Sequence, residues 1–173
     1  MKILITGATG ALGGRLVQKL ISVSNYEVRI LIRRQSVGIY EDTDIEIVNG
    51  DLRESDSLVR ASKNVDAIIH LAAITHTHKH SLYGEINHVG TENLIRAANF
   101  SGVRRFIFLS TKTASYNRGA YAKSKILAEE SLIKSELDWT IIRPAEVYGI
   151  ASSHGIQKIT AILEKGYPLP IVG

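Results

Sequence analysis

The chain alternates short apolar runs with longer amphipathic runs, and this alternation is what most restricts its fold. Strands rich in β-branched residues are predicted at 2–6, 26–32, 45–48, 66–70, 103–109 and 138–142. Helices are predicted near 11–23, 55–62, 83–101, 120–136 and 155–165. Strands that alternate with helices in this way indicate βαβ units and a parallel sheet. We therefore predict a doubly wound α/β fold with three layers, α/β/α.

A glycine-rich turn follows the first predicted strand. Gly7, Gly10 and Gly13 lie at three-residue intervals, and an amphipathic stretch begins directly after them. Glycine allows a positive φ and a close approach of the backbone to a ligand. The N-terminus of a helix offers unpaired N–H groups and the positive end of the helix dipole to a diphosphate. Although the spacing departs from the commoner G-x-G-x-x-G, it predicts a dinucleotide site in a Rossmann-like sheet, with a plain turn as the alternative.

Two arginines follow the second predicted strand. Arg33 lies 20 residues after Gly13, where an NAD-binding protein tends to carry an acidic residue for the ribose 2′-hydroxyl. An arginine at that place can instead hold a 2′-phosphate. The sequence therefore predicts NADP in preference to NAD, with Arg33 or Arg34 pairing with the phosphate. The alternative is that both are solvated charges of a loop.

Tyr121 and Lys125 are four residues apart in a predicted helix, and Thr111 lies ten residues before Tyr121. Positions i and i+4 share one face of a helix. A neighbouring ammonium favours the phenolate, so the pKa of Tyr121 is expected to fall. Such a tyrosine can take or give a proton at a substrate hydroxyl or carbonyl. An isolated Y-x-x-x-K match is weak evidence for a catalytic site. The glycine turn near the start of the chain strengthens that evidence here.

Composition excludes several classes of function. The 173 residues contain no cysteine, so disulfides and thiolate metal sites are ruled out. No run of 18 or more apolar residues occurs, and the chain opens with a predicted strand. We therefore expect no membrane partner and a cytoplasmic location. The net charge of +4 is spread without a basic stripe, which argues against nucleic-acid binding. No metal site is predicted, because the alternating histidines of residues 76–80 lack flanking carboxylates at ligand spacing.

With these parts in place, the sequence resembles the extended short-chain dehydrogenase/reductase family, the NAD(P)-dependent nucleotide-sugar epimerases and dehydratases. The resemblance runs the length of the chain, and the short loop before Tyr121 is similar to that of the atypical, NADP-preferring branch. The motifs that carry it are T-G-A-T-G-A-L-G (6–13), G-D-L (50–52), D-A-I-I-H-L-A-A (66–73), N-H-V-G-T-E-N-L (87–94), F-I-F-L-S-T (106–111), Y-A-K-S-K (121–125) and I-I-R-P-A-E-V-Y-G (141–149).

The resemblance implies a role for each matching residue. Tyr121 would be the acid/base during hydride transfer, and Lys125 would lower its pKa and hold the nicotinamide ribose. Thr111 would hydrogen-bond the reacting oxygen, with Ser110 as the structural alternative, and Asn87 would pack or hydrogen-bond inside the central helix. The implied cofactor-binding residues are Gly7, Thr9, Gly10, Ala11, Leu12, Gly13, Arg33, Arg34, Asp51 (to the adenine amino group), Leu52, Leu71, Ala72, Ala73, Ser110, Tyr121, Lys125 and Pro144 (over the nicotinamide).

Members of that family usually continue into a C-terminal substrate domain. We expect residues 1–150 to form the NAD(P)-binding domain and 151–173 to begin a truncated substrate-binding region. An uncovered apolar face would favour self-association, so a homodimer is possible. The expected substrate is a nucleotide sugar or a related hydroxyl or carbonyl compound. Three functions stay open: an epimerase, dehydratase or reductase, a non-catalytic NADP-sensing domain, and a folded domain that binds nucleotide weakly.

Some residues are expected to serve the fold alone. His70 ends an apolar strand and is expected to be a core histidine with satisfied hydrogen bonds. Glu129 and Glu130 are expected on a solvated face of the helix that carries Tyr121. Trp139 is expected to pack in the last predicted strand.

Overall fold

A computed structural model describes residues 1–23, 25–33, 40, 44–145, 147 and 164–166. Six parallel strands form one sheet. They are β1 (Lys2–Thr6), β2 (Glu27–Ile32), β3 (Glu46–Asn49), β4 (Ala67–His70), β5 (Arg105–Leu109) and β6 (Asp138–Ile142). The helical segments are α1 (Ala11–Ser22), α2 (Ser55–Ser62), the π-helix η2 (Tyr83–Val89), α3 (Gly90–Phe100) and α4 (Gly119–Ile133).

The strand order is β3-β2-β1-β4-β5-β6, so the direction of winding reverses between β1 and β4. In register, Thr6 of β1 lies opposite His70 of β4. In open parallel sheets, ligands bind beyond the carboxyl ends of the strands at such a reversal. The turns after β1 and β4 are therefore where the topology places a site.

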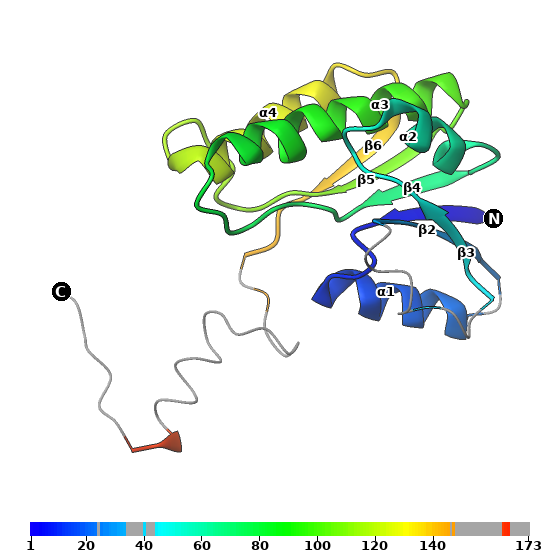
Figure 1. The fold of residues 1–173 in the computed structure, drawn as a ribbon, viewed down its shortest axis with the longest axis horizontal. Helices are drawn as coiled ribbons and strands as arrows, with labels where there is room; N and C mark the ends of the chain where they lie inside the picture. Colours follow the sequence, from blue (N-terminus) through cyan, green and yellow to red (C-terminus); the bar gives the residue numbers. More distant parts are fainter. Residues whose placement is uncertain (24, 34–39, 41–43, 146, 148–163, 167–173) are drawn as a thin grey trace.

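Helices cover both faces of the sheet. Figure 1 shows α1 on one face and α2, α3 and α4 on the other. The larger core lies under α2, α3 and α4, and Leu4, Ile68 and Phe106 supply its sheet side. A second core lies under α1, with Ile3, Ile5 and Ile30. The three-layer α/β/α prediction is confirmed.

The predicted strands and helices match the described elements to within a few residues, with one difference in kind. Residues 83–101 were expected to be one helix, but they form the π-helix η2 followed by α3. Gly90, at the junction, lies against Leu52: a Cβ at Gly90 would be 2.8 Å from Leu52 Cβ. Short π-helical segments next to α-helices are frequently found at functional sites.

Two other expectations concern the end of the sheet and the chain beyond it. Trp139 is 38% exposed, so the prediction that it packs is wrong. Among the described residues, β6 pairs only with β5 and forms the edge of the sheet. The predicted helix near 155–165 and the domain boundary at 150/151 lie almost wholly outside the described residues. Among the residues that are described, no helix is both long and apolar enough to span a membrane.

Candidate functional site: a dinucleotide pocket at the β1/β4 switch point

The glycine turn after β1 packs so closely that side chains would not fit. Gly7 has a φ of +77°, and a Cβ there would lie 2.6 Å from the backbone nitrogen of Ala72. A Cβ at Gly13 would lie 2.1 Å from the carbonyl oxygen of Gly7. The first turn of α1 is thereby held against the end of β1, and Gly10, at its N-cap, provides no side-chain hydrogen bond to the helix. The N–H groups at this helix end are available for an anion.

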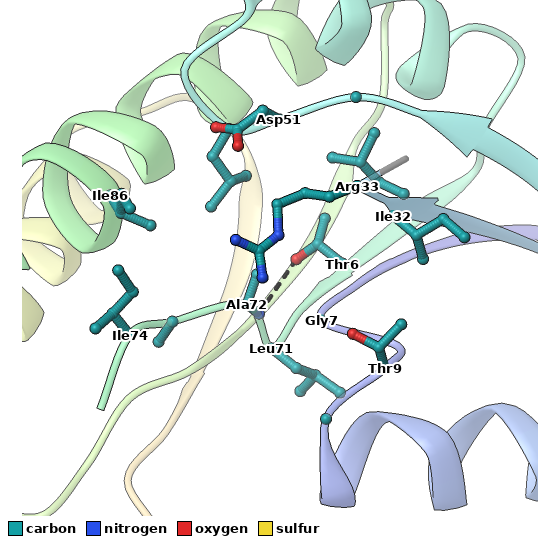
Figure 2. Close-up of a pocket in the computed structure, with 15 residues that line it drawn as sticks. Thr6, Gly7, Thr9, Ile32, Arg33, Asp51, Leu71, Ala72, Ile74 and Ile86 are labelled. Carbon is teal, nitrogen blue, oxygen red and sulfur yellow. Dashed lines mark hydrogen bonds between the residues drawn. The ribbon is translucent and has the colours of Figure 1, made fainter. Parts of the chain in front are cut away.

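A pocket of about 240 Å³ opens beside this turn. Figure 2 shows the Arg33 side chain reaching across it, with Asp51 on one side and Thr9 on the other. The lining residues are Thr6, Gly7, Thr9, Gly10, Leu31, Ile32, Arg33, Gly50, Asp51, Leu52, Leu71, Ala72, Ala73, Ile74 and Ile86. Most of them follow the carboxyl ends of β1, β2, β3 and β4, so the switch point and the pocket coincide.

The residues present fit a dinucleotide. Because the glycine turn has few side chains, a diphosphate can approach its backbone closely. The positive end of the α1 dipole favours the negative charge of the diphosphate. Apolar side chains such as Leu52 and Ile86 line the far part of the pocket, where a flat base can be buried. Arg33 brings a cation to the same space, whereas Arg34 lies outside the described residues.

Asp51 is held in place by a neighbour that the sequence reasoning did not single out. Arg53 donates from Nε to Asp51 Oδ1 at 2.8 Å and from Nη2 to Oδ2 at 3.0 Å. These hydrogen bonds hold the pKa of Asp51 below its ordinary value. Arg53 also pairs with Glu85 of η2 at 3.3 Å. The carboxylate keeps free lone pairs, so its predicted contact with an adenine amino group stays a prediction.

A buried hydrogen-bonded chain starts at Thr6 and Ala72 of the pocket lining and runs behind them; we call it the floor of the pocket. Ala72 N–H donates to Thr6 Oγ1 at 3.3 Å, and Thr6 Oγ1 lies 2.6 Å from His70 Nδ1. On the other side of the ring, Nε2 lies 2.9 Å from Thr91 Oγ1, which donates its own proton to Asn87 O. His70 Nε2 must therefore be the donor and Nδ1 the acceptor, which is the neutral tautomer.

Burial supports that assignment. His70 is fully buried, and burial lowers its pKa to about 3. Its ring stacks on Phe108 at 5.4 Å between centroids. The expectation of a core histidine with satisfied hydrogen bonds is confirmed.

Asn87 connects this floor to helix α4. Its side-chain amide bonds both backbone groups of Ile74, at 2.8 and 2.9 Å, and donates to Ser124 Oγ at 3.1 Å. Ser124 in turn donates to the carbonyl oxygen of Tyr121. Asn87 was expected to pack or hydrogen-bond inside the central helix near the site. It is buried in η2, but its side chain bonds outside that helix, to the segment after β4 and to α4.

Tyr121 and Lys125 share one face of α4, but their electrostatics differ from the prediction. The Lys125 ammonium donates to the carbonyl oxygen of Leu109 at 2.6 Å and lies 4.0 Å from the centroid of the Phe108 ring. Burial raises the pKa of Tyr121, with a smaller contribution from Tyr83, whose ring lies edge-on at 5.9 Å. The predicted lowering of the Tyr121 pKa is therefore wrong.

Lys125 is itself the perturbed group. It is only 2% exposed, and burial lowers its pKa to about 7, against the opposing effect of Glu129. Sequence spacing could place the two side chains on one face but could not say toward which backbone group the ammonium turns.

The two hydroxyl residues at the end of β5 have different surroundings. Ser110 is buried and donates to Glu129 Oε1, whereas Thr111 is half-buried and shares a hydrogen bond with Thr113 at 3.1 Å. Of the two, Thr111 is the one with access to a ligand. Glu129 is fully buried and pairs with Arg143, so the expectation of a solvated Glu129 is wrong. Its neighbour Glu130 is partly exposed and accepts from Tyr116.

The predicted residues fall into two groups around this site. Gly7, Thr9, Gly10, Arg33 and the predicted residues of the β3 and β4 turns line the pocket. Ala11 and Leu12 begin α1 beside it, while Gly13 is buried behind Gly7. The other group lies outside the pocket lining, in the segment after β5, on α4 and in the segment after β6: Ser110, Thr111, Tyr121, Lys125 and Pro144.

Several site residues were not found from the sequence. Ile32 is the last residue of β2, and Gly50, which was quoted in the G-D-L motif but given no role, directly follows β3; both could have been found from those positions alone. Tyr83 and Arg143 carry no comparable signal. Their relation to the site comes from contacts between separate elements, of Tyr83 with Tyr121 and of Arg143 with Glu129. No group of three or more His, Asp or Glu side chains that could hold a metal ion occurs within the described ranges.

Comparison with known proteins identifies the family. Residues 7–161 match the family described as NAD(P)H-binding. The chain belongs to this NAD(P)H-binding family. It is 32% identical over 194 residues to a UDP-glucose 4-epimerase of Vibrio cholerae, covering 97% of this chain and 58% of the relative. It is 27% identical to the photosystem II assembly factor Ycf39 of a Synechocystis species, covering 84% of this chain and 46% of the relative.

Solved structures agree. The structure of the dTDP-glucose 4,6-dehydratase DesIV (double mutant) of Streptomyces venezuelae, with NAD and DAU bound, matches with a TM-score of 0.80 and 27% identity, covering all of this chain and 65% of that one. The predicted resemblance to NAD(P)-dependent epimerases and dehydratases is confirmed, as is an NAD(P) cofactor. The chain spans about half the length of the curated relatives it matches.

Proposed function

We propose that this NAD(P)H-binding chain is the cofactor half of an epimerase, dehydratase or reductase that acts on a nucleotide sugar or a related hydroxyl or carbonyl compound. The observation that supports it most is the joining of two parts by Asn87. One part is the pocket at the β1/β4 switch point, and the other is the Tyr121 helix. The epimerase and dehydratase relatives support the same class of reaction.

A bound nicotinamide ring supplies the hydride acceptor or donor. The part of this chain is to orient the substrate and move a proton at its reacting oxygen. Thr111 donates a hydrogen bond to that oxygen, and Tyr121 takes the proton as the phenolate or gives it as the phenol. Burial of Tyr121 favours the neutral phenol, which is the form that gives a proton to a carbonyl being reduced.

Lys125 fits a supporting role in that step. A turn of the ammonium from the carbonyl oxygen of Leu109 toward a ribose hydroxyl would bring its charge to the side of α4 that carries Tyr121. The cation would then favour the phenolate and complete the acid/base pair.

We propose NADP as the preferred cofactor, with NAD as the alternative. Arg33 reaches into the pocket, and its guanidinium can pair with a 2′-phosphate. Asp51, on the far side of the same pocket, is occupied by Arg53, which leaves Arg33 for the phosphate.

The catalytic proposal is tested with Tyr121→Phe, using Tyr116→Phe as the control. Tyr116 is exposed and bonds only Glu130 among the described residues, so its loss leaves the site intact. Both variants are incubated with NADP or NAD and with UDP- and dTDP-sugars, and the products are separated by chromatography. Turnover that disappears in Tyr121→Phe alone supports the role of the phenol, and unchanged turnover in Tyr121→Phe refutes it.

A non-catalytic NADP-sensing domain is the second candidate. It is favoured by the Lys125 ammonium lying on Leu109 O, away from an acid/base role, and by the similarity to an assembly factor. It predicts that dinucleotide changes the binding of a partner protein while no sugar is converted. Under that function, Tyr121→Phe would leave partner binding unaltered.

A further inference from the structure

Glu129 is a buried carboxylate that lies two helical turns after Tyr121 and one turn after Lys125. The three residues follow one another at four-residue intervals along α4, so they share one face of the helix. Glu129 is 0% exposed. A charge so deeply buried is tolerated only with good partners.

Its partners come from two other elements. Ser110 Oγ, at the end of β5, donates to Glu129 Oε1. Arg143, which follows β6, donates from Nε to Oε1 at 2.9 Å and to Oε2 at 3.1 Å, and also donates from Nη2 to Oε2. One carboxylate therefore joins α4 to the carboxyl ends of both β5 and β6.

The segments that follow β5 and β6 also carry two of the predicted site residues, Thr111 and Pro144. Ser110 directly precedes Thr111, and Arg143 directly precedes Pro144. Backbone bonds run between the same two segments, from Ser110 N–H to Ile142 O at 2.7 Å and from Lys112 N–H to Pro144 O at 3.1 Å. A shift of Arg143 would therefore move Thr111 and Pro144 together.

We propose that Glu129 is a positioning residue of this site, which holds Thr111 and Pro144 in place against Tyr121 and Lys125 through Ser110 and Arg143. This inference rests on the proposed function, in which Thr111 and Tyr121 act at the reacting oxygen of the substrate and Lys125 turns toward the ribose. It also uses the expectation, from the family resemblance, that Pro144 lies over the nicotinamide. The adenine half lies on the other part of the site, around Arg33 and Asp51, which Glu129 does not touch.

The two halves of the ligand give a direct test. Isothermal titration calorimetry of the whole chain measures the affinities for NADPH and for adenosine 2′,5′-bisphosphate, which carries the adenine half alone. Glu129→Gln keeps the size of the side chain but removes the charge that Arg143 pairs with. The control is Glu130→Gln, which removes a carboxylate at the next position, where it bonds Tyr116 away from the strand ends.

We expect Glu129→Gln to bind NADPH about tenfold more weakly, equivalent to roughly 1.4 kcal/mol. Its affinity for the bisphosphate should stay within about twofold of the original. Glu130→Gln should match the original protein with both ligands. Arg143→Gln should repeat the Glu129→Gln result, and since the Arg143 side chain is 52% exposed, this variant tests the idea even if Glu129→Gln does not fold.

Three results would overturn the inference, and they differ from one another. NADPH affinity unchanged in both Glu129→Gln and Arg143→Gln would show that the strand ends need no such tie. Equal weakening of both ligands would show that Glu129 serves the fold as a whole. An original protein that binds neither ligand would refute the proposed function itself, and the positioning role with it.

Discussion

The closest backbone contact of the pocket can be tested with a matched pair of glycine variants. Gly7 and Gly102 have similar positive φ values, +77° and +70°, so alanine is strained at both. Placing alanine in that conformation costs about 1–2 kcal/mol. The two sites differ in space: a Cβ at Gly7 would meet Ala72 N at 2.6 Å, whereas at Gly102 no described atom lies within 4 Å.

The difference between the two variants therefore isolates the contact with Ala72. Overpacking of this kind costs about 1–3 kcal/mol. Gly102→Ala should lower the free energy of unfolding by about 1–2 kcal/mol, and Gly7→Ala by about 2–5 kcal/mol. For a chain of this size, 1 kcal/mol corresponds to about 2–4 °C in melting temperature. The effect of alanine on the unfolded chain is the same at both positions and cancels in the comparison.

Ligand binding gives the second measurement. Moving the glycine turn away from Ala72 displaces the N-terminus of α1 from the pocket, so Gly7→Ala should bind NADPH at least about tenfold more weakly. Gly102→Ala, at the end of α3, should bind as the original protein does. Calorimetric titration and thermal unfolding of both variants measure these effects. If the two variants were equally stable and bound NADPH equally well, the proposed role of the close Gly7–Ala72 contact in stability and in binding would be refuted.

Three further predictions follow from the charges of the site. Arg33→Asp should weaken NADP binding about tenfold or more and improve NAD binding, as measured by titration with each; an unchanged ratio of affinities would remove the 2′-phosphate assignment. Because the pKa of Lys125 is lowered from 10.5 to about 7, the unfolded chain binds more protons between these values. The free energy of unfolding should then rise with pH across that window, by up to about 1.4 kcal/mol per unit, and Lys125→Met should remove this slope in urea titrations. The pKa of His70 falls from 6.5 to about 3, so its contribution to stability should be lost as pH falls through that range; His70→Asn should flatten the acid limb of the urea-unfolding curve, and parallel limbs would contradict the buried neutral ring.

Local patterns were enough for the fold and for half of the site. The glycine turn, the Arg33 position and the turn after β4 depend on residues close together in sequence, and all line the pocket. The strand order could be expected from βαβ alternation because right-handed crossovers leave few choices.

What sequence could not give depends on contacts between distant segments. Glu129 looks like a surface residue until β6 brings Arg143 beside it. The direction of the Lys125 ammonium depends on Leu109 and Phe108 of β5, and the Asn87 amide meets Ile74, 13 residues away in the chain. None of these contacts can be inferred from the periodicity of the sequence. Predictions based on residue spacing alone were therefore wrong about the exposure of Glu129 and about the direction of the Tyr121 pKa shift.

The hydrogen-bonded chain from Ala72 through Thr6 and His70 to Thr91 also affects which parts of the pocket determine the affinity for different dinucleotides. Its members are satisfied without any ligand, so the floor of the pocket is preorganised and little conformational entropy of the protein is lost there on binding. Discrimination between dinucleotides would then arise at the rim, from Arg33 and Asp51, while the floor contributes equally to all of them.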